Sequence, residues 1–367
     1  MMLGFMFGAI VGSFLNVVIY RMPRGKSLNN PKHSFCPSCG HQLGVPDLFP
    51  LLSWLLLLGK CRYCGKPVSA RYFVVELVNG LIWMGVWYQY LLGPTPDLGK
   101  AIAYALTASA LVAIIFIDIE LYLIPEQINA FLLFVGFGYN LWLYAQGLPS
   151  ATTWGIPSSV AGALVGVGIL WGIAFLGRIA FRKDAMGHGD IKMARGVGAV
   201  LFPALAGVSF GLAVVLGAVL GIVQVVVRAR MNRGSGEAGK LASMRTGTAT
   251  PLHPSSSSGP PQEEGVPESI GSLLKCGIGY ILCLDVIGLF AKKFYKSYFG
   301  EDPFEPPADL ETFEADFTMI PFGPYLALGA IVAAVFERQL LGAVTSYLNG
   351  LAPSPAQIGI TFFGNTF

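Results

Sequence analysis

Long apolar stretches recur along this sequence, and most are close to the length that crosses a lipid bilayer. Eight of them are candidate spans: 2–20, 72–93, 99–117, 124–145, 156–181, 190–203, 205–228 and 321–349. A bilayer-spanning helix needs about 20 predominantly apolar residues. Only 12% of the residues are charged and 54% are hydrophobic, whereas about a quarter of a soluble domain is charged. We therefore predict an all-α polytopic membrane protein with about eight transmembrane helices.

The positive charges predict how these helices are oriented. Residues 21–71 carry eight Lys or Arg and a single acid, Asp47, and basic loops stay on the cytoplasmic side of a membrane. We expect this loop to be cytoplasmic and the N-terminus to lie outside. Because basic residues follow the first apolar stretch and none precedes it, we interpret residues 1–20 as a retained anchor and not as a cleaved signal.

The apolar run 190–228 is interpreted as two crossings. As a single helix at about 1.5 Å per residue it would be roughly 60 Å long, twice the thickness of the hydrocarbon core. Pro203 favours a break within the run. Two crossings also return the basic segment 228–233 to the cytoplasmic side. The transmembrane core is then 72–228.

Residues 229–319 are predicted to form an insert that is partly disordered. Residues 229–268 are rich in Ser, Pro, Gly and Thr, a composition that cannot bury enough apolar surface to order itself. The apolar segment 269–291 contains Asp285, which is costly in lipid, so we expect this segment to lie at the interface or to be re-entrant. A C-terminal transmembrane helix and tail, 320–367, follow the insert.

The loop 21–71 contains two Cys-x-x-Cys pairs, each followed by a glycine. The four cysteines are Cys36, Cys39, Cys61 and Cys64. Four thiolates at this spacing are typical of a structural zinc site, because they leave no open position for a substrate. Two disulfides or four unligated thiols are the alternatives, and a reducing cytoplasm argues against the disulfides. We predict a small cytoplasmic domain folded around Zn2+.

Two aspartates are predicted to lie at the same depth on the cytoplasmic side. Asp118 ends the third span and Asp190 begins the sixth, although 72 residues separate them. Acids at the ends of spans are commonly just interfacial. Two carboxylates in a partly dry site share a proton, however, and this is the state that an aspartic peptidase uses. We therefore interpret Asp118 and Asp190 as candidate catalytic residues.

The sequence around Asp190 indicates a close approach of the backbone. Gly187 and Gly189 have no side chains, so the chain can turn sharply and a substrate strand can come near the carboxylate. Lys192 is included as a supporting residue of this catalytic loop. His188, which lies between the two glycines, is interpreted as a permissive position.

Two other functions remain open from the residues alone. Intramembrane acids also occur in proton-coupled transporters, but the chain has no internal inverted repeat that would support one. A membrane scaffold without catalytic activity is the second. The net charge of +3 and the lack of a basic, aromatic-rich stretch exclude a nucleic-acid partner and leave membrane lipid as the surroundings.

Six sequence blocks resemble those of the bacterial type IV prepilin peptidases and occur in the same order. They are GSFLNVVIYRMPRG (12–25), the Cys-x-x-Cys pairs, LLSWLLLLGKCRYCG (51–65), IDIELYLIPE (117–126), MGHGDIKMARGVGA (186–199) and IPFGPYLALGA (320–330). The resemblance implies an intramembrane aspartic peptidase of the GxGD type in the bacterial inner membrane. Such an enzyme removes the leader from type IV prepilins and type II secretion pseudopilins, and its catalytic aspartates correspond here to Asp118 and Asp190.

The resemblance also implies a second activity, N-methylation of the new N-terminal residue by S-adenosylmethionine. No GxGxxG strand-turn-helix unit is present, so the donor must bind elsewhere, and the cysteine loop is the natural candidate. Gly59 and Lys60 are candidates for binding the donor's carboxylate, although Lys60 equally fits a simple cytoplasmic charge. Glu76 is a candidate for binding the positive N-terminus of the pilin, or for a pair with Arg71 or Arg21. The family commonly has aspartate where Glu126 stands, and it usually lacks the insert.

Overall fold

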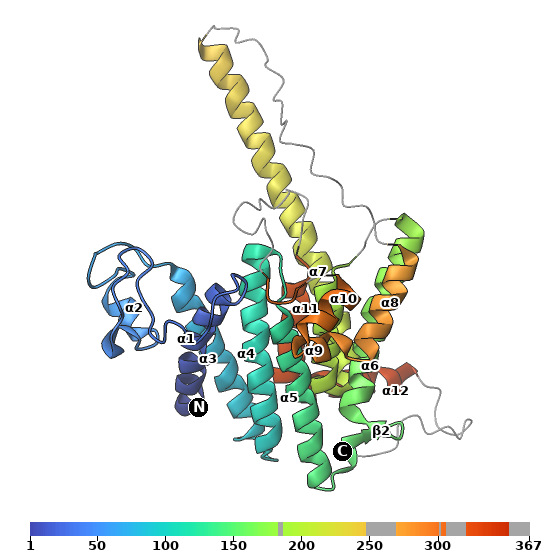
Figure 1. Ribbon diagram of the computed structural model, residues 1–367. Coiled ribbons are helices and arrows are strands. Elements are labelled where there is room, and N and C mark those ends of the chain that lie inside the picture. The colour runs from blue at the N-terminus through green and yellow to red at the C-terminus, as the bar shows by residue number, and fades with distance from the viewer. Residues whose placement is uncertain (183–185, 247–268, 301, 306–320, 352–367) are drawn as a thin grey trace.

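The fold is an all-α bundle, known from a computed structural model that describes residues 1–182, 186–246, 269–300, 302–305 and 321–351 (Figure 1). The longer helices are α1 (Met2–Arg21), α3 (Ala70–Tyr90), α4 (Leu98–Leu121), α5 (Glu126–Ala145), α6 (Ser158–Phe181) and α7 (His188–Thr246). The shorter ones are α2 (Leu52–Leu56), α8 (Ile270–Ile281), α9 (Leu284–Leu289), α10 (Lys292–Phe299), α11 (Gly323–Val335) and α12 (Glu337–Leu351). Two 3-10 turns, Val45–Asp47 and Pro149–Ala151, and a hairpin of β1 (Thr152–Thr153) and β2 (Ile156–Pro157) complete the elements.

Helices α1 and α3 run antiparallel and touch along their whole length. Gly4 of α1 faces Trp87, which is near the end of α3, whereas Gly12 faces Glu76, which is near its start. Between these contacts the Asn79 side chain donates to the carbonyl of Gly8 at 2.7 Å. Small residues let helix backbones approach closely, and buried polar side chains bond across the interface where no water reaches them. Because of this packing, α3 lies at the same depth in the membrane as α1.

The core between α5, α6 and α7 is built on the same principle. A Cβ atom added at Gly162 of α6 would meet the backbone of Gly198 in α7, and one at Gly166 would meet Ala194. Gly136 of α5 packs in the same way against Ala199. The first part of α7, which carries Asp190, is therefore held tightly between two other helices.

The predicted break at Pro203 is present in α7. Phe202 has φ 61° and ψ 170°, which interrupts the helix immediately before the proline. After the break α7 runs back toward the end of the bundle where Asp118 lies. Two contacts with α11 show this: Ser209 of α7 packs against Gly329, well inside α11, whereas the later residue Gly217 packs near Phe322, just before α11 begins. The part before the break is only about 20 Å long at 1.5 Å per residue, which is shorter than the hydrocarbon core.

The predicted number of eight spans is not confirmed. Within the described part of the chain, five helices are long and apolar enough to cross a membrane: α1, α4, α5, α6 and α7 up to Val223. The predicted span 321–349 is instead a pair of helices, α11 and α12, bent by 90°, and counting the pair as one span gives six. Helix α3 is not among them, because its tryptophans, tyrosines and amides lower its hydropathy.

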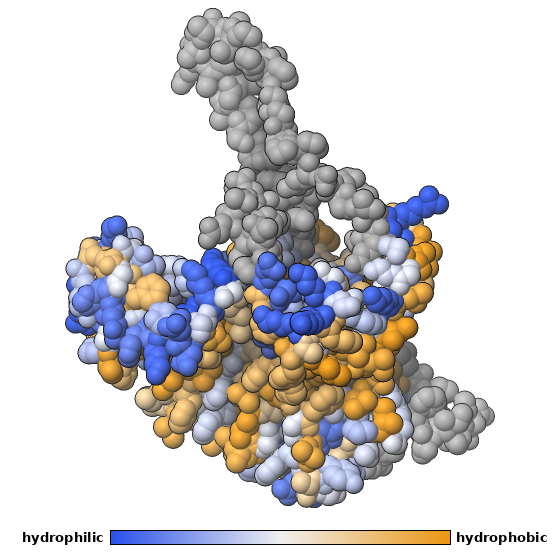
Figure 2. Space-filling view, in the orientation of Figure 1, coloured by the Kyte–Doolittle hydropathy of each residue, from blue (hydrophilic) through white to orange (hydrophobic). Residues whose placement is uncertain are grey.

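Hydropathy divides the surface into an apolar belt and two polar ends (Figure 2). On the face shown, orange side chains cover the middle of the bundle, and hydrophilic residues gather at its upper end and on the cysteine loop. The loop 22–69 joins α1 to α3 at this end, and the β1–β2 hairpin lies at the opposite one (Figure 1). This distribution is that of a multi-pass membrane protein.

The predicted insert has more helical structure than its composition suggested. The backbone of α7 remains helical to Thr246, beyond the predicted start of the insert at residue 229 (Figure 1). The apolar segment 269–291 forms α8 and α9, and α10 follows it. Most of the predicted disorder, 247–268 and 306–319, lies outside the described residues.

Candidate active site and loop pocket

Asp118 and Asp190 approach each other at one end of the bundle. Asp118 is in the last turn of α4 and only 5% exposed, and Asp190 is in the first turn of α7. The Asp190 carboxylate is close enough to Asp118 to interact with its charge. The two residues that were predicted to lie at matched depth therefore face a common site.

A backbone amide of a glycine binds each carboxylate. The N–H of Gly323, at the start of α11, donates to Asp118, and the N–H of Gly187 donates to Asp190. The Oδ1 atom of Asp190 is buried and has no hydrogen-bond partner among the described residues. Each aspartate is thus oriented by one amide, and Asp190 keeps an oxygen atom for a water or a proton.

Ile124 lies between the start of α7, which carries Asp190, and the start of α11, which binds Asp118. A Cβ atom at Gly189 would lie 3.1 Å from Cβ of Ile124, and one at Gly323 would lie 3.1 Å from Cδ1 of the same residue. At Gly323 the added atom would also collide with the carboxylate of Asp118. Gly323 is a site residue that the sequence reasoning missed, and its only signal was its place in the block IPFGPYLALGA.

Lys192 does not point at the aspartates. Its ammonium group pairs with the Glu126 carboxylate. The same group lies among aromatic rings and is 3.2 Å from the hydroxyl of Tyr295, so its contacts are with these residues and not with Asp118 or Asp190. His188, predicted to be permissive, is also engaged, since its Nδ1 is 2.8 Å from the hydroxyl of Tyr280. Both residues therefore connect the start of α7 to neighbouring segments of the chain.

The four cysteines of the loop form one cluster. Their Sγ atoms all lie within 4.8 Å of one another, and sulfurs around a tetrahedral metal with bonds of about 2.3 Å are roughly 3.8 Å apart. The donor set therefore fits a single metal ion. The thiols do not ionise alike without a metal ion. Although burial opposes ionisation, backbone N–H groups of Ser38 and Cys39 lower the pKa of Cys36 to about 7. Despite a backbone hydrogen bond from His41, burial and the neighbouring thiols Cys36 and Cys64 raise the pKa of Cys39 to about 11.

The two Cys-x-x-Cys pairs have the same local geometry. In each, the N–H of the glycine after the second cysteine bonds to the carbonyl of the first, at 2.8 Å for Gly40 and 2.9 Å for Gly65. Both glycines have a positive φ, 71° and 68°, which a side chain would make costly. This explains why a glycine follows each pair.

Asp47 joins the two halves of the loop. It accepts hydrogen bonds from Arg62 at 2.7 Å and from the Tyr63 hydroxyl at 2.9 Å. Burial raises the pKa of Asp47, but the bonds from Tyr63 and Arg62 outweigh it and lower this pKa below its ordinary value. A lowered carboxyl pKa stabilises the loop above the pKa of the unfolded chain, and this contribution is lost as the pH falls through the folded pKa.

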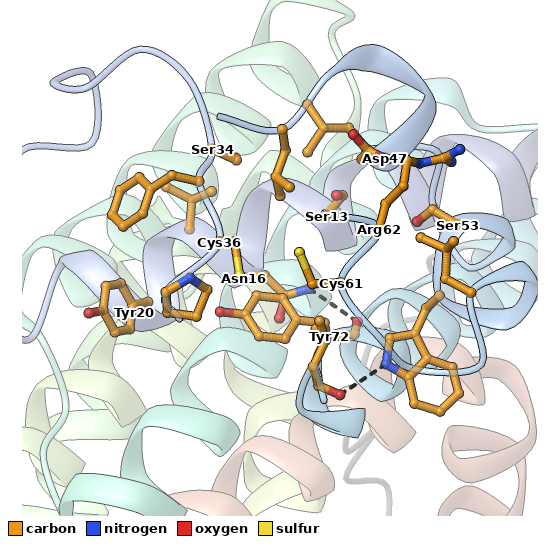
Figure 3. Close-up of a pocket in the computed structure, with 18 of the residues that line it drawn as sticks. Ser13, Asn16, Tyr20, Ser34, Cys36, Asp47, Ser53, Cys61, Arg62 and Tyr72 are labelled. Atoms are coloured by element: carbon orange, nitrogen blue, oxygen red, sulfur yellow. Dashed lines mark hydrogen bonds and ion pairs between the residues drawn. The ribbon is translucent and has the colours of Figure 1, made fainter. Parts of the chain in front are cut away.

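A pocket lies between the cysteine loop and helices α1 and α3 (Figure 3). Figure 3 shows Asn16 and Tyr72 on the helical side, and Cys36 and Cys61 on the loop side. Asn16 is only 3% exposed, and its Oδ1 atom has no hydrogen-bond partner in the part of the chain described. The pocket therefore offers an unsatisfied acceptor to a ligand.

Two of the three predicted methyl-transfer residues line this pocket. Lys60 and Glu76 belong to its wall, whereas Gly59 packs against the ring of Trp54 and does not line it. Glu76 pairs with no arginine in the described structure; its carboxylate accepts the N–H of Leu51 at 2.8 Å. Of the two arginines considered for it, Arg71 instead pairs with Glu120 at 2.6 Å, and Arg21 donates to the carbonyl of Pro31 at 2.8 Å.

Comparisons with known proteins agree with this division into two sites. Residues 6–90 match the model of the bacterial peptidase A24 N-terminal domain, and residues 105–222 match that of the type IV leader peptidase family. A prepilin leader peptidase/N-methyltransferase of Aeromonas hydrophila is 34% identical over 247 residues, which cover 61% of this chain and 81% of the relative. The chain belongs to the type IV leader peptidase family. No solved structure matches the chain significantly.

The family assignment clarifies the two departures noted in the sequence. A Myxococcus xanthus member, also named prepilin leader peptidase/N-methyltransferase, is 32% identical over 339 residues and matches 92% of this chain and 89% of its own length. The match therefore extends into the segment 229–319, so the insert is not peculiar to this family member. Glu126, the second departure, lies outside the dyad and pairs with Lys192.

Proposed function

We propose that this protein is an intramembrane aspartic endopeptidase that removes the leader peptide from type IV prepilins and from type II secretion pseudopilins. Its family and the names of its relatives support this activity. The observation that carries the mechanism is the convergence of Asp118 and Asp190, each bound by the N–H of a glycine. The transporter and scaffold alternatives have no comparable support.

The two carboxylates act as one acid–base unit. Two carboxyl groups at a shared, partly dry site hold one proton between them. The ionised carboxylate takes a proton from a water molecule as the water attacks the scissile carbonyl, and the protonated one donates to the developing oxyanion. The buried Oδ1 of Asp190, which lacks a partner in the described structure, suits either role.

We place the reaction at the cytoplasmic face of the bacterial inner membrane. The basic cysteine loop favours that side for its end of the bundle, and the Arg71–Glu120 ion pair ties the start of α3 to the end of α4, two residues from Asp118. A prepilin has a basic leader followed by an apolar helix. Its cleavage site therefore lies at this boundary when the helix is in the bilayer.

We further propose that the loop pocket carries out N-methylation with S-adenosylmethionine as the donor. Lys60 would bind the carboxylate of the donor, and Glu76 would bind the new pilin N-terminus, since both line the pocket. Asn16 adds a buried acceptor. Gly59 acts indirectly, because its positive φ of 69° and its contact with Trp54 shape the turn before Lys60.

The cysteine cluster would hold Zn2+ in a structural role. Cys36, Cys39, Cys61 and Cys64 supply all four ligands of a tetrahedral site and leave none for a substrate. The ion would fix the loop that forms one wall of the pocket, because Cys36 and Cys61 also line it.

Purified protein and a prepilin with a Gly–Phe junction test both activities together. Mass spectrometry of the product is expected to show the pilin without its leader and, with S-adenosylmethionine present, one added methyl group. A prepilin that remains intact with the wild-type protein would contradict the proposed function.

Replacement of Lys60 by alanine is expected to separate the two activities. Loss of a charge-assisted hydrogen bond lowers methylation by about 10-fold or more, while cleavage changes by less than about two-fold. Lys66→Ala is the matched control, because Lys66 is an exposed cation of the same loop that does not line the pocket. Equal methylation by both variants would argue against the role of Lys60.

Removal of one cysteine ligand is expected to release the metal. The wild type should hold about one zinc ion per chain, and Cys36→Ser should hold close to none, because a structural site needs all four ligands. Elemental analysis measures the content, and Cys276→Ser, outside the cluster, should retain the wild-type value. Zinc bound equally by both variants would contradict the assignment.

A further inference from the structure

Residues 269–300, which include α8, α9 and α10, pack against the start of α7 (Figure 1). This segment comes from the region that was predicted as an insert. It is anchored to its neighbours as well, since Trp171 of α6 donates to the carbonyl of Leu273 at 3.2 Å. We call it the clamp segment, because its contacts meet the helix that carries Asp190.

Two polar residues in the first turns of α7 are bound by aromatic residues of the clamp segment. The His188 ring is 2.8 Å from the hydroxyl of Tyr280. The ammonium of Lys192 is 3.2 Å from the hydroxyl of Tyr295 and lies 5.1 Å from the ring centre of Tyr280 and 5.5 Å from that of Phe299. A cation over aromatic faces in a dry site is attracted by their quadrupoles.

A buried ion pair makes the third contact. Arg195 donates to Asp285 through both terminal nitrogens, at 2.8 Å and 2.5 Å, and also to the carbonyl of Tyr280 at 2.7 Å. Both side chains are almost fully enclosed, with 2% and 1% of their surface exposed. Such a bidentate pair is directional, and removing one partner leaves the other charge buried without compensation.

These contacts all fall on the face of α7 opposite to Asp190. At 3.6 residues per turn, His188, Lys192 and Arg195 lie within about 60° of one another, and Asp190 lies about 200° from His188. The clamp segment therefore touches the back of the helix while Asp190 faces Asp118. Rotation or sliding of the first turn of α7 would break all three contacts.

We propose that the clamp segment fixes the orientation of Asp190 toward Asp118, and that Tyr280 and Asp285 are positioning residues for leader cleavage. This inference rests on the proposed peptidase function. Gly187 and Gly189 precede Asp190 and leave the local backbone few restraints of its own. The restraint must then come from tertiary contacts. Helices α5 and α6 hold α7 from Ala194 onward, and the clamp segment adds contacts nearer to Asp190, at His188 and Lys192.

Steady-state kinetics of prepilin cleavage by the full-length protein tests the proposal. Asp285→Asn is expected to lower kcat by about 10-fold or more, since a displacement of about 1 Å at a catalytic group can cost 100-fold. Tyr280→Phe keeps the ring and should lower kcat by about 3- to 10-fold. KM should change by less than about two-fold for both, because the proposal has both residues act through α7 and not through binding of the substrate.

The matched control is Tyr298→Phe. Tyr298 belongs to the same segment, and its hydroxyl donates to the carbonyl of Lys275 within that segment. This variant should retain the wild-type kcat. All rates are normalised to the concentration of folded, monodisperse protein and measured below the unfolding temperature of the least stable variant, so that loss of folded material is not counted as loss of kcat.

The pH profile of kcat distinguishes positioning from simple support of the fold. A shifted dyad shares its proton differently, so the two variants should have an altered profile, which partial unfolding would not produce. Wild-type kcat and profile in Tyr280→Phe and Asp285→Asn, with Asp190→Asn inactive, would overturn the clamp and leave the peptidase standing. Cleavage absent from the wild type would remove both proposals.

Discussion

Asp118→Asn and Asp190→Asn are each expected to lower leader cleavage by about 1,000-fold or more, because an amide keeps the shape of the side chain but cannot exchange the proton. Asp118 is 5% exposed and bound by the Gly323 amide, so its geometry should survive the change. The fraction of prepilin processed over time in proteoliposomes measures the loss. Insertion and folding of each variant are checked by its thermal unfolding.

Asp97→Asn is the control for these variants. Asp97 caps the opposite end of α4, where its side chain accepts the N–H of Lys100 at 2.8 Å. Asparagine caps a helix about as well as aspartate does, so both stability and cleavage should be retained. A large loss of cleavage in this control would mean that any change in α4 inactivates the enzyme and that Asp118 is not special.

Gly323→Ala is expected to lower cleavage by about 100-fold, because the added methyl group collides with the carboxylate of Asp118 and must displace it. Gly323 also supplies the amide bound to that carboxylate, so the backbone cannot move away without losing the bond. Cleavage kinetics and methylation are measured on the same preparation. Methylation of pilin from which the leader has already been removed should persist, because the loop pocket lies on other elements.

Gly138→Ala provides the comparison for this substitution. A Cβ atom added at Gly138 of α5 meets no other atom within 4 Å, so the same chemical change there is expected to be silent. Activity retained by Gly323→Ala would show that the site tolerates displacement of Asp118, and the described geometry would then not be the catalytic one.

The features that the sequence predicted best are those that depend on local order. Each Cys-x-x-Cys-Gly stretch folds on itself, so its spacing alone indicated the cluster of four cysteines. The common depth of Asp118 and Asp190 followed from where two apolar runs end and begin. Both inferences needed only the period of a helix and the thickness of a bilayer.

Features that depend on contacts between distant segments could not be predicted from the sequence. Gly323 binds Asp118 from 205 residues away through its backbone N–H, and no local sequence pattern indicates such a contact. The segment 269–291 was expected to lie at the interface or to be re-entrant because of Asp285, whose partner, Arg195, lies 90 residues before it and could not be recognised. The count of eight spans is not confirmed for a similar reason, since the 90° bend between α11 and α12 depends on tertiary packing.

The central claim is that Asp118 and Asp190 form one catalytic unit, and a double-mutant cycle on cleavage tests it most directly. Cleavage rates are measured for the wild type, Asp118→Asn, Asp190→Asn and the double variant, with the product N-terminus read by mass spectrometry. If the two act as a unit, the double variant will be about as slow as either single variant. Losses that multiply, or a single variant that cleaves at the wild-type rate, would contradict the account.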